Sequence, residues 1–180
     1  MKTIKQFSIP FGGLRIGKHN FEFKITDEFF ANFDYSLIKS GTINLSLEFD
    51  KQQEAMFILN FLLQGHVNLT CERCLDLYQY GINAEERLVV KLGEESYDDP
   101  EILVISRNEH SIDISPLVYE FISLALPLIH QHSLDESGEP MCNNETAKVL
   151  KALENAQQEL GERKEKNDPR WDILNKLKNN

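Results

Sequence analysis

Two cysteines separated by two residues, Cys71 and Cys74, are the side chains of this chain best suited to chemistry. Thiolates at this spacing can both point at one tetrahedral Zn²⁺ ion if two further ligands complete the set. The residues available for this are His130, His132 and Cys142, all far from the pair in the sequence. One such pair is weaker evidence for zinc than two pairs, and Cys71 also continues the apolar phase of its strand. The pattern alone leaves open half of a metal site or two inert thiols.

Catalytic motifs are absent from the sequence: it contains no G-x-S-x-G, His-Glu-x-x-His, P-loop or dinucleotide fingerprint. Nothing assembles a nucleophile, a base and an orienting group, so we predict that the protein is not an enzyme. Two alternatives remain open. One is a small-molecule-binding β-barrel with a pocket lined by residues such as Phe57, Phe61 and Tyr80. The weaker one is a zinc hydrolase that uses Cys71, Cys74 and a histidine.

Alternating apolar and polar side chains dominate the first two thirds of the chain. The runs span residues 21–26, 43–50, 57–71 and 78–92. A period of two is typical of strands with one face on a core and the other in water, as in antiparallel sheets. Gly65 interrupts the longest run and lets the strand bend without changing face. We therefore expect a strongly curled antiparallel sheet or a partly closed barrel, with the cysteine pair near a hairpin turn.

The periodicity changes after residue 93. An acidic loop at 94–101 and a short edge strand at 103–106 are expected to precede a helix. Ser115 is the expected N-cap of this helix and Pro116 its first residue, where a missing N–H costs nothing. Apolar side chains then recur at helical spacing until Pro127, which is expected to end the helix.

The remainder of the chain is expected to be helical after an acidic linker. The linker spans 131–145, and helices are predicted at 146–160 and 168–177. The fold class predicted is α+β: a curled antiparallel β-sheet or partly closed barrel followed by two or three helices. Residues 1–130 are predicted to form a β-rich body that ends in a packed helix. Residues 131–180 are then either part of the same domain or a partner-binding tail.

The charge of the chain limits its partners. The 180 residues include 19 basic and 29 acidic side chains, a formal net charge of −10. This opposes a protein that coats nucleic acid through its whole surface. Residues 162–180, however, carry six basic and four acidic side chains, leaving −12 on residues 1–161. A mildly basic tail is compatible with contact to RNA or to an RNA-bound protein, and its candidate contact residues are Arg170, Trp171, Leu174, Lys176 and Lys178.

The location expected from the sequence is the cytoplasm. The first ten residues have no uninterrupted apolar segment and no small-residue cleavage site, so we expect no signal peptide. The most apolar stretch, 117–129, is interrupted by polar residues and is shorter than the roughly 20 residues that span a bilayer. Three cysteines, an odd number, do not predict a disulfide framework.

Three short segments in a fixed order resemble the YceD family of large ribosomal RNA subunit accumulation proteins. They are Cys71-Glu72-Arg73-Cys74-Leu75; Leu124-Ala125-Leu126-Pro127-Leu128 followed by His132 and Cys142; and Asp168-Pro169-Arg170-Trp171 with Leu174. The resemblance runs from about residue 67 to the end of the chain. The first 60 residues match only in their strand-rich character.

The resemblance implies a cytosolic bacterial factor, without assigned catalytic activity, that supports processing or accumulation of large-subunit ribosomal RNA. Its implied partners are that RNA or large-subunit ribosomal proteins, with neither DNA nor a membrane among them. The candidate cofactor is zinc, and the family pattern maps its ligands to Cys71, Cys74, His132 and Cys142. The chain departs from the pattern by a nearby His130, an alternative ligand, and by lacking a further cysteine cluster after Cys142.

Overall fold

A computed structural model of the chain describes most of the residues up to position 156. The described residues are 5–34, 36–94, 102–134, 136, 138, 141–142, 145–146, 148–153 and 155–156. They fall into two compact units, each of which is considered by itself. The first unit comprises residues 1–70 and 77–130, and the second comprises residues 71–76 and 131–180.

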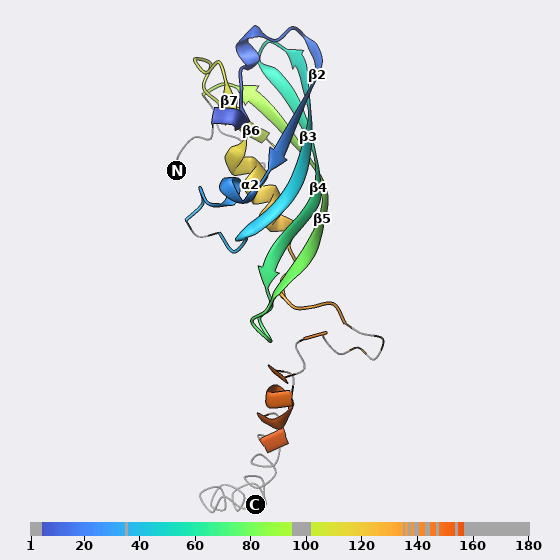
Figure 1. Ribbon diagram of the computed structural model, residues 1–180. Coiled ribbons are helices and arrows are strands. Elements are labelled where there is room, and N and C mark those ends of the chain that lie inside the picture. Colours follow the sequence, from blue (N-terminus) through green and yellow to red (C-terminus); the bar gives the residue numbers. More distant parts are fainter. Residues whose placement is uncertain are drawn as a thin grey trace, which may run out of the picture. The chain divides into compact units, whose positions relative to one another are not determined.

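A five-stranded sheet forms most of the first unit (Figure 1). Its strand order is β2-β3-β4-β5-β6, and a separate two-stranded sheet pairs β1 with β7. The strands are β1 (Ser8–Ile9), β2 (Gly17–Ile25), β3 (Ser40–Gln53), β4 (Met56–Thr70), β5 (Leu77–Leu92), β6 (Ile102–Ile105) and β7 (Ile112–Asp113). The helices are η1 (Lys5–Phe7), η2 (Phe11–Gly13), α1 (Asp27–Phe30) and α2 (Ser115–Leu124).

The predicted alternation is confirmed along the long strands. Buried and exposed positions alternate on β3, and β4 keeps one phase on the core from Phe57 to Leu69. Figure 1 shows β3, β4 and β5 curving around α2, so one face of the sheet lies on the core and the other faces outward. The α+β class and the curled sheet are confirmed. Among the described residues the barrel does not close, since β2 and β6 are the two edges of an open sheet.

The edge strand predicted at 103–106 exists as β6, but it runs parallel to β5. The sheet is therefore mixed rather than wholly antiparallel. A parallel neighbour requires the chain to cross back before it pairs, whereas a hairpin neighbour does not. All four residues of β6 are half-buried, so its sequence carries no alternation from which a direction could be inferred.

Helix α2 covers the inner face of the sheet. Val118 and Ile122 are buried, and the ring of Phe121 lies 5.1 Å from that of Phe61 on β4. The predicted cap was displaced by one residue: the N-cap is Ile114, and Ser115 is the first helical residue. The reason is a preceding carboxylate, because Asp113 accepts hydrogen bonds from both the N–H and the hydroxyl of Ser115. Of the helix predicted at 146–160, residues 146, 148–153 and 155–156 are described and helical, as is residue 145 just before it.

Gly65 on β4 allows the backbone of β3 to approach closely. A Cβ atom at this position would overlap the carbonyl oxygen of Thr42 and lie 2.6 Å from the Cα atom of Ile43 on β3. We expect Gly65→Ala to lower the free energy of unfolding by about 2–3 kcal/mol, because backbone on the paired strand must shift. Gly81→Ala on β5 is the matched control, since nothing lies within 4 Å of its added Cβ. Denaturant unfolding measures both, and equal effects would contradict the close approach.

Candidate metal centre

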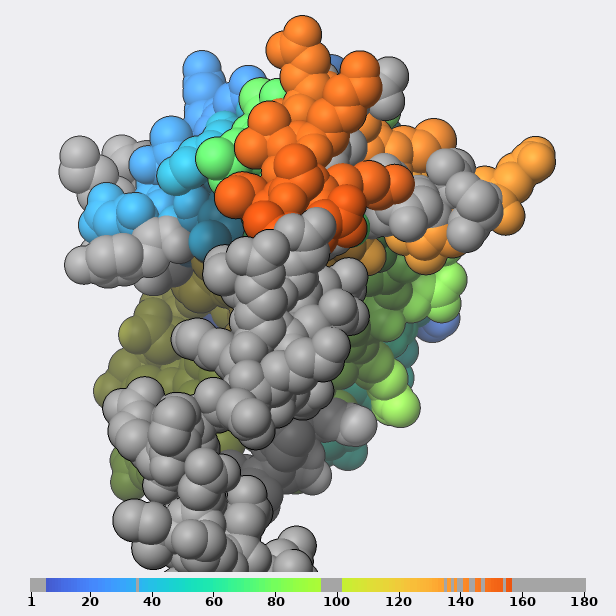
Figure 2. Space-filling view, turned by 90° about the horizontal axis from the view of Figure 1, so that it is seen from below, coloured from blue at the N-terminus to red at the C-terminus, as the bar shows by residue number. Residues whose placement is uncertain are grey.

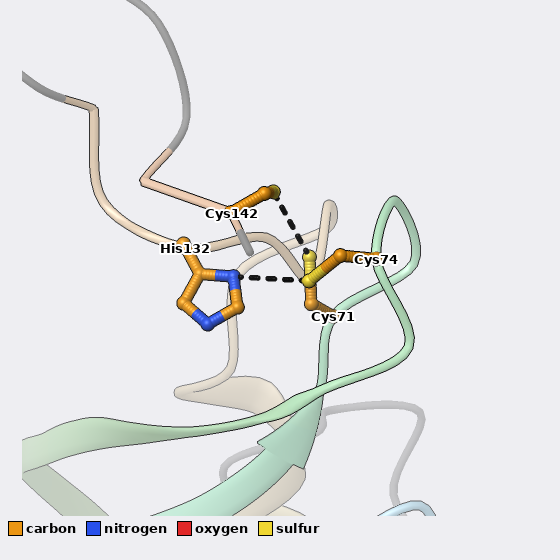
Figure 3. A group of neighbouring side chains, drawn as sticks. All are labelled: Cys71, Cys74, His132 and Cys142. Carbon is orange, nitrogen blue, oxygen red and sulfur yellow. Dashed lines mark hydrogen bonds between the residues drawn. The ribbon is translucent and has the colours of Figure 1, made fainter. Parts of the chain in front are cut away.

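The turn after β4 places two thiols side by side. The N–H of Cys71 donates to the carbonyl of Asp76, and the N–H of Leu75 donates to the carbonyl of Cys71, each at 2.9 Å. Leu75 adopts a left-handed backbone conformation, with φ of 64°. This tight turn brings Cys71 and Cys74 to the same side of the loop (Figure 3). Both side chains are buried.

The other half of the centre comes from the segment after residue 130. The N–H of Met141 donates to the carbonyl of Ser133 at 3.0 Å, which joins the two sides of this segment. Gly138, with φ of 82°, lies between them in a conformation that favours glycine. The pairing brings His132 and Cys142 together although nine residues separate them.

Four ligand atoms converge in the second unit: the thiols of Cys71, Cys74 and Cys142 and a ring nitrogen of His132, all within 4.8 Å of one another. The sulfurs of Cys71 and Cys142 are 3.9 Å apart, and the sulfur of Cys74 lies 3.5 Å from Nδ1 of His132 (Figure 3). Around tetrahedral Zn²⁺, with bonds of about 2.3 Å to sulfur and 2.0 Å to nitrogen, ligand atoms lie about 3.5–3.8 Å apart. The cluster could therefore hold a metal ion.

The donor set determines which metal chemistry fits. Three thiolates and one imidazole match structural zinc sites, in which four protein ligands close the coordination sphere. A catalytic site would keep one position open for water, so this set opposes the zinc hydrolase considered from the sequence. His130, the alternative ligand, is not a member of the group that the described residues form.

The charge within the cluster is unevenly distributed. Burial raises the pKa of Cys71, but hydrogen bonds with the backbone of Cys74, Arg73 and His132 and with the Cys74 thiol outweigh it and lower the pKa to about 6. Burial, together with hydrogen bonds to Cys74 and Cys71 and their charge, raises the pKa of Cys142 to about 11. Near neutral pH, one thiolate is thus stabilised at Cys71 while Cys142 keeps its proton.

Metal binding is therefore expected to release a proton. Ligation requires the Cys142 thiolate, so affinity should rise roughly tenfold per pH unit above neutrality for each proton released. Cys71 adds to this proton release only below pH about 6, because above that pH its thiol is already ionised before the metal binds. Calorimetry of Zn²⁺ binding in buffers of different ionisation enthalpy measures the release. Cys142→Ser should release one proton fewer, and a pH-independent affinity would contradict the assignment.

Two of the residues expected to line the pocket of the β-barrel alternative, Phe57 and Phe61, are packed in the core. Phe57 packs between Phe11 and Phe49, with ring centres 4.9 and 5.2 Å away, and Phe61 packs against α2. A groove of about 770 Å³ lies on the sheet, and its lining includes Asn20, Glu48 and Arg87 together with the apolar residues Phe21, Leu47 and Phe61. At Phe57 and Phe61 the apolar face of the curled strands is thus filled by the protein itself.

Other site predictions fall outside this centre. The five predicted contact residues of the tail lie outside the described residues: Arg170, Trp171, Leu174, Lys176 and Lys178.

Three exposed apolar side chains near the ligands were not predicted from the sequence. They are Leu75, Leu134 and Met141, each within two residues of a ligand. The only indication in the sequence was an apolar residue within two positions of Cys74, His132 and Cys142. In the described part of the chain, no helix combines the length and apolar character needed to cross a membrane.

Comparison with known proteins gives one family. The family model described as "Large ribosomal RNA subunit accumulation protein YceD" matches residues 59–178. The matched region begins within β4 and contains all four residues of the cluster. No curated protein and no solved structure matches the chain significantly.

Proposed function

Because the chain belongs to the YceD family, described as large ribosomal RNA subunit accumulation proteins, we propose that it is a non-enzymatic factor in ribosome biogenesis. It promotes processing or accumulation of large-subunit ribosomal RNA by binding. The observation that carries this proposal is the family match across 59–178, two thirds of the chain. The closed donor set supports binding rather than catalysis, since structural zinc sites stabilise folds and leave no position for a substrate.

The cofactor of this proposal is zinc, held by Cys71, Cys74, His132 and Cys142. These side chains fit the ion in donor type and spacing. Zinc would join the β4–β5 turn to the segment after residue 130, which is the role of a cross-link between distant parts of a chain. This role requires no chemistry at the metal.

The proposed partners are large-subunit ribosomal RNA or large-subunit ribosomal proteins, in the cytoplasm. Residues 131–180 would form the partner-binding part, with Arg170, Trp171, Leu174, Lys176 and Lys178 as its contact residues. The net charge of +2 on residues 162–180, against −12 elsewhere, supports a contact made locally rather than over the whole surface.

Trp171→Ala is expected to impair function more than folding if the tail contacts a partner. An aromatic anchor at an interface contributes about 2 kcal/mol or more to binding, while it adds little to the stability of the free protein. Large-subunit RNA levels in cells and denaturant unfolding of the purified protein measure the two effects. Asn179→Ala is the control and should change neither. Equal losses of stability and function would assign Trp171 to the protein's own core.

Deletion of the gene tests the proposed function. We expect the ratio of large- to small-subunit ribosomal RNA to fall and free large subunits to decrease in sucrose gradients. Expression of the wild-type chain should restore both. Unchanged ribosome profiles, together with no recovery of large-subunit RNA or proteins after crosslinking, would contradict the proposal.

A further inference from the structure

Three apolar side chains beside the metal ligands are exposed. Leu75, Leu134 and Met141 have exposed fractions of 75%, 53% and 56%. Leu75 follows Cys74, Leu134 lies two residues after His132, and Met141 precedes Cys142. We call these three residues the apolar rim. Single exposed apolar residues are common on proteins, but several that flank one centre indicate an interaction surface.

The backbone holds the apolar rim close to the cluster. The N–H of Met141 donates a hydrogen bond to the carbonyl of Ser133, the neighbour of Leu134. The N–H of Leu75 donates to the carbonyl of Cys71 and closes the turn that carries Leu75. Because the four ligand atoms lie within 4.8 Å of one another, the backbone of the three residues near the ligands in sequence is held close to one centre. The described residues of this segment, drawn in orange in Figure 2, lie at the surface.

Leu75 is not a residue that the fold requires. Its left-handed backbone, with φ of 64°, favours glycine or asparagine, and a leucine there is costly. An exposed side chain gains almost nothing in the folded protein to offset this cost. A strained, exposed leucine next to a metal ligand therefore points to a contact outside the chain.

Acidic residues outnumber basic ones among the described residues near the ligands. The described residues within 71–76 and 131–142 include three exposed acidic side chains, Glu72, Asp76 and Glu136, and one basic side chain, Arg73. Such a surface repels the phosphates of RNA and attracts basic protein segments.

We propose that the apolar rim and the acidic side chains near the ligands dock a lysine- and arginine-rich protein segment through an apolar anchor residue. The anchor would lie among Leu75, Leu134 and Met141, while its basic neighbours would meet the carboxylates. This inference rests on the proposed function only for its biological setting. It narrows the choice of partner at this surface to a basic protein rather than RNA.

Binding of defined probes to the full zinc-loaded chain tests the proposal. The probes are a short fluorescent peptide rich in lysine with interspersed leucines, the same peptide with serine replacing leucine, and single-stranded polyuridine. We expect only the leucine peptide to bind at the apolar rim, with affinity that falls as salt rises. The triple variant Leu75→Ser, Leu134→Ser and Met141→Ser should bind it roughly tenfold or more weakly.

The matched control is Ile16→Ser with Leu37→Ser, which removes side chains of 63% and 68% exposure from the first unit and should leave affinity unchanged. Zinc content of the triple variant, measured in parallel, separates loss of the rim from loss of the site. Equal binding of the leucine and serine peptides, or of the triple variant and wild type, would overturn the proposal, as would polyuridine binding that depends on the rim.

Crosslinking in cells identifies the occupant. A photoreactive analogue placed at position 134 should capture basic segments of other proteins, whereas the same analogue at position 16 should not. Capture of RNA, of a second copy or of the chain's own C-terminal segment would overturn the assignment. If the triple variant binds the leucine peptide like the wild type while deletion lowers ribosomal RNA, docking fails and the function stands. If deletion leaves ribosomal RNA unchanged, the function fails while peptide binding stands.

Discussion

Cys74→Ser is expected to weaken zinc binding by about a hundredfold. Apparent binding free energies of structural zinc sites are about 12 kcal/mol near neutral pH, so loss of one of four ligands costs on the order of 3 kcal/mol. Serine keeps nearly the volume of cysteine but supplies a hydroxyl with little affinity for zinc. The buried position of Cys74 gives water limited access to replace the missing ligand.

Competition with a chromophoric chelator measures this loss. Ser133→Ala is the matched control, because Ser133 lies beside His132 with an exposed side chain, and only its backbone carbonyl bonds to Met141. It should bind zinc like the wild type. His130→Ala should likewise retain affinity, since His130 is not part of the cluster. A His130 variant that binds more weakly than His132→Ala would contradict the ligand assignment.

The long strands could be predicted because a strand that buries one face carries an apolar side chain at every second residue. Each of β3 and β4 buries one face, so a shift of one residue would expose the whole apolar set. The direction of β6 could not be predicted in this way, since its residues are all half-buried. The start of α2 was predicted one residue late because the carboxylate of Asp113 accepts hydrogen bonds from the N–H and the hydroxyl of Ser115, which becomes the first helical residue.

The ligand set could be predicted only in part from the residues themselves. The spacing of Cys71 and Cys74 is local, so the sequence shows it directly. Their partners His132 and Cys142 stand 58 and 71 positions away from Cys74 and Cys71, and no local pattern specifies such a pairing. The residues alone allowed either His130 or His132, and the resemblance favoured His132. The fold brings His132 into the cluster through the Ser133–Met141 bond, which no motif encodes.

The two units differ in what stabilises them, and this difference determines the effect of removing the metal. The core cluster of buried apolar residues lies entirely within the first unit. Among the described residues of the second unit, only Cys71 and Cys74 are buried. A segment that buries so little cannot offset the conformational entropy of ordering its chain. Zinc binding, at about 10 kcal/mol or more, would supply the missing free energy.

Chelation of zinc is therefore expected to unfold the second unit and leave the first intact. The N–H groups of Leu75 and Met141 should lose their protection from hydrogen exchange, because their hydrogen bonds lie in the second unit. The N–H groups within β4, such as that of Phe61, should stay protected, since the core of the first unit does not include the cluster. Exchange measured by NMR before and after chelation separates the two responses.

A double variant, Cys71→Ser with Cys74→Ser, is the control for direct effects of the chelator. Its second unit should already exchange rapidly, and chelator should then add no further change. Retained protection of Leu75 and Met141 after complete metal removal would show that the second unit folds without zinc. Loss of protection across β4 would show that the sheet depends on the metal, contrary to the burial of its core by residues of the first unit alone.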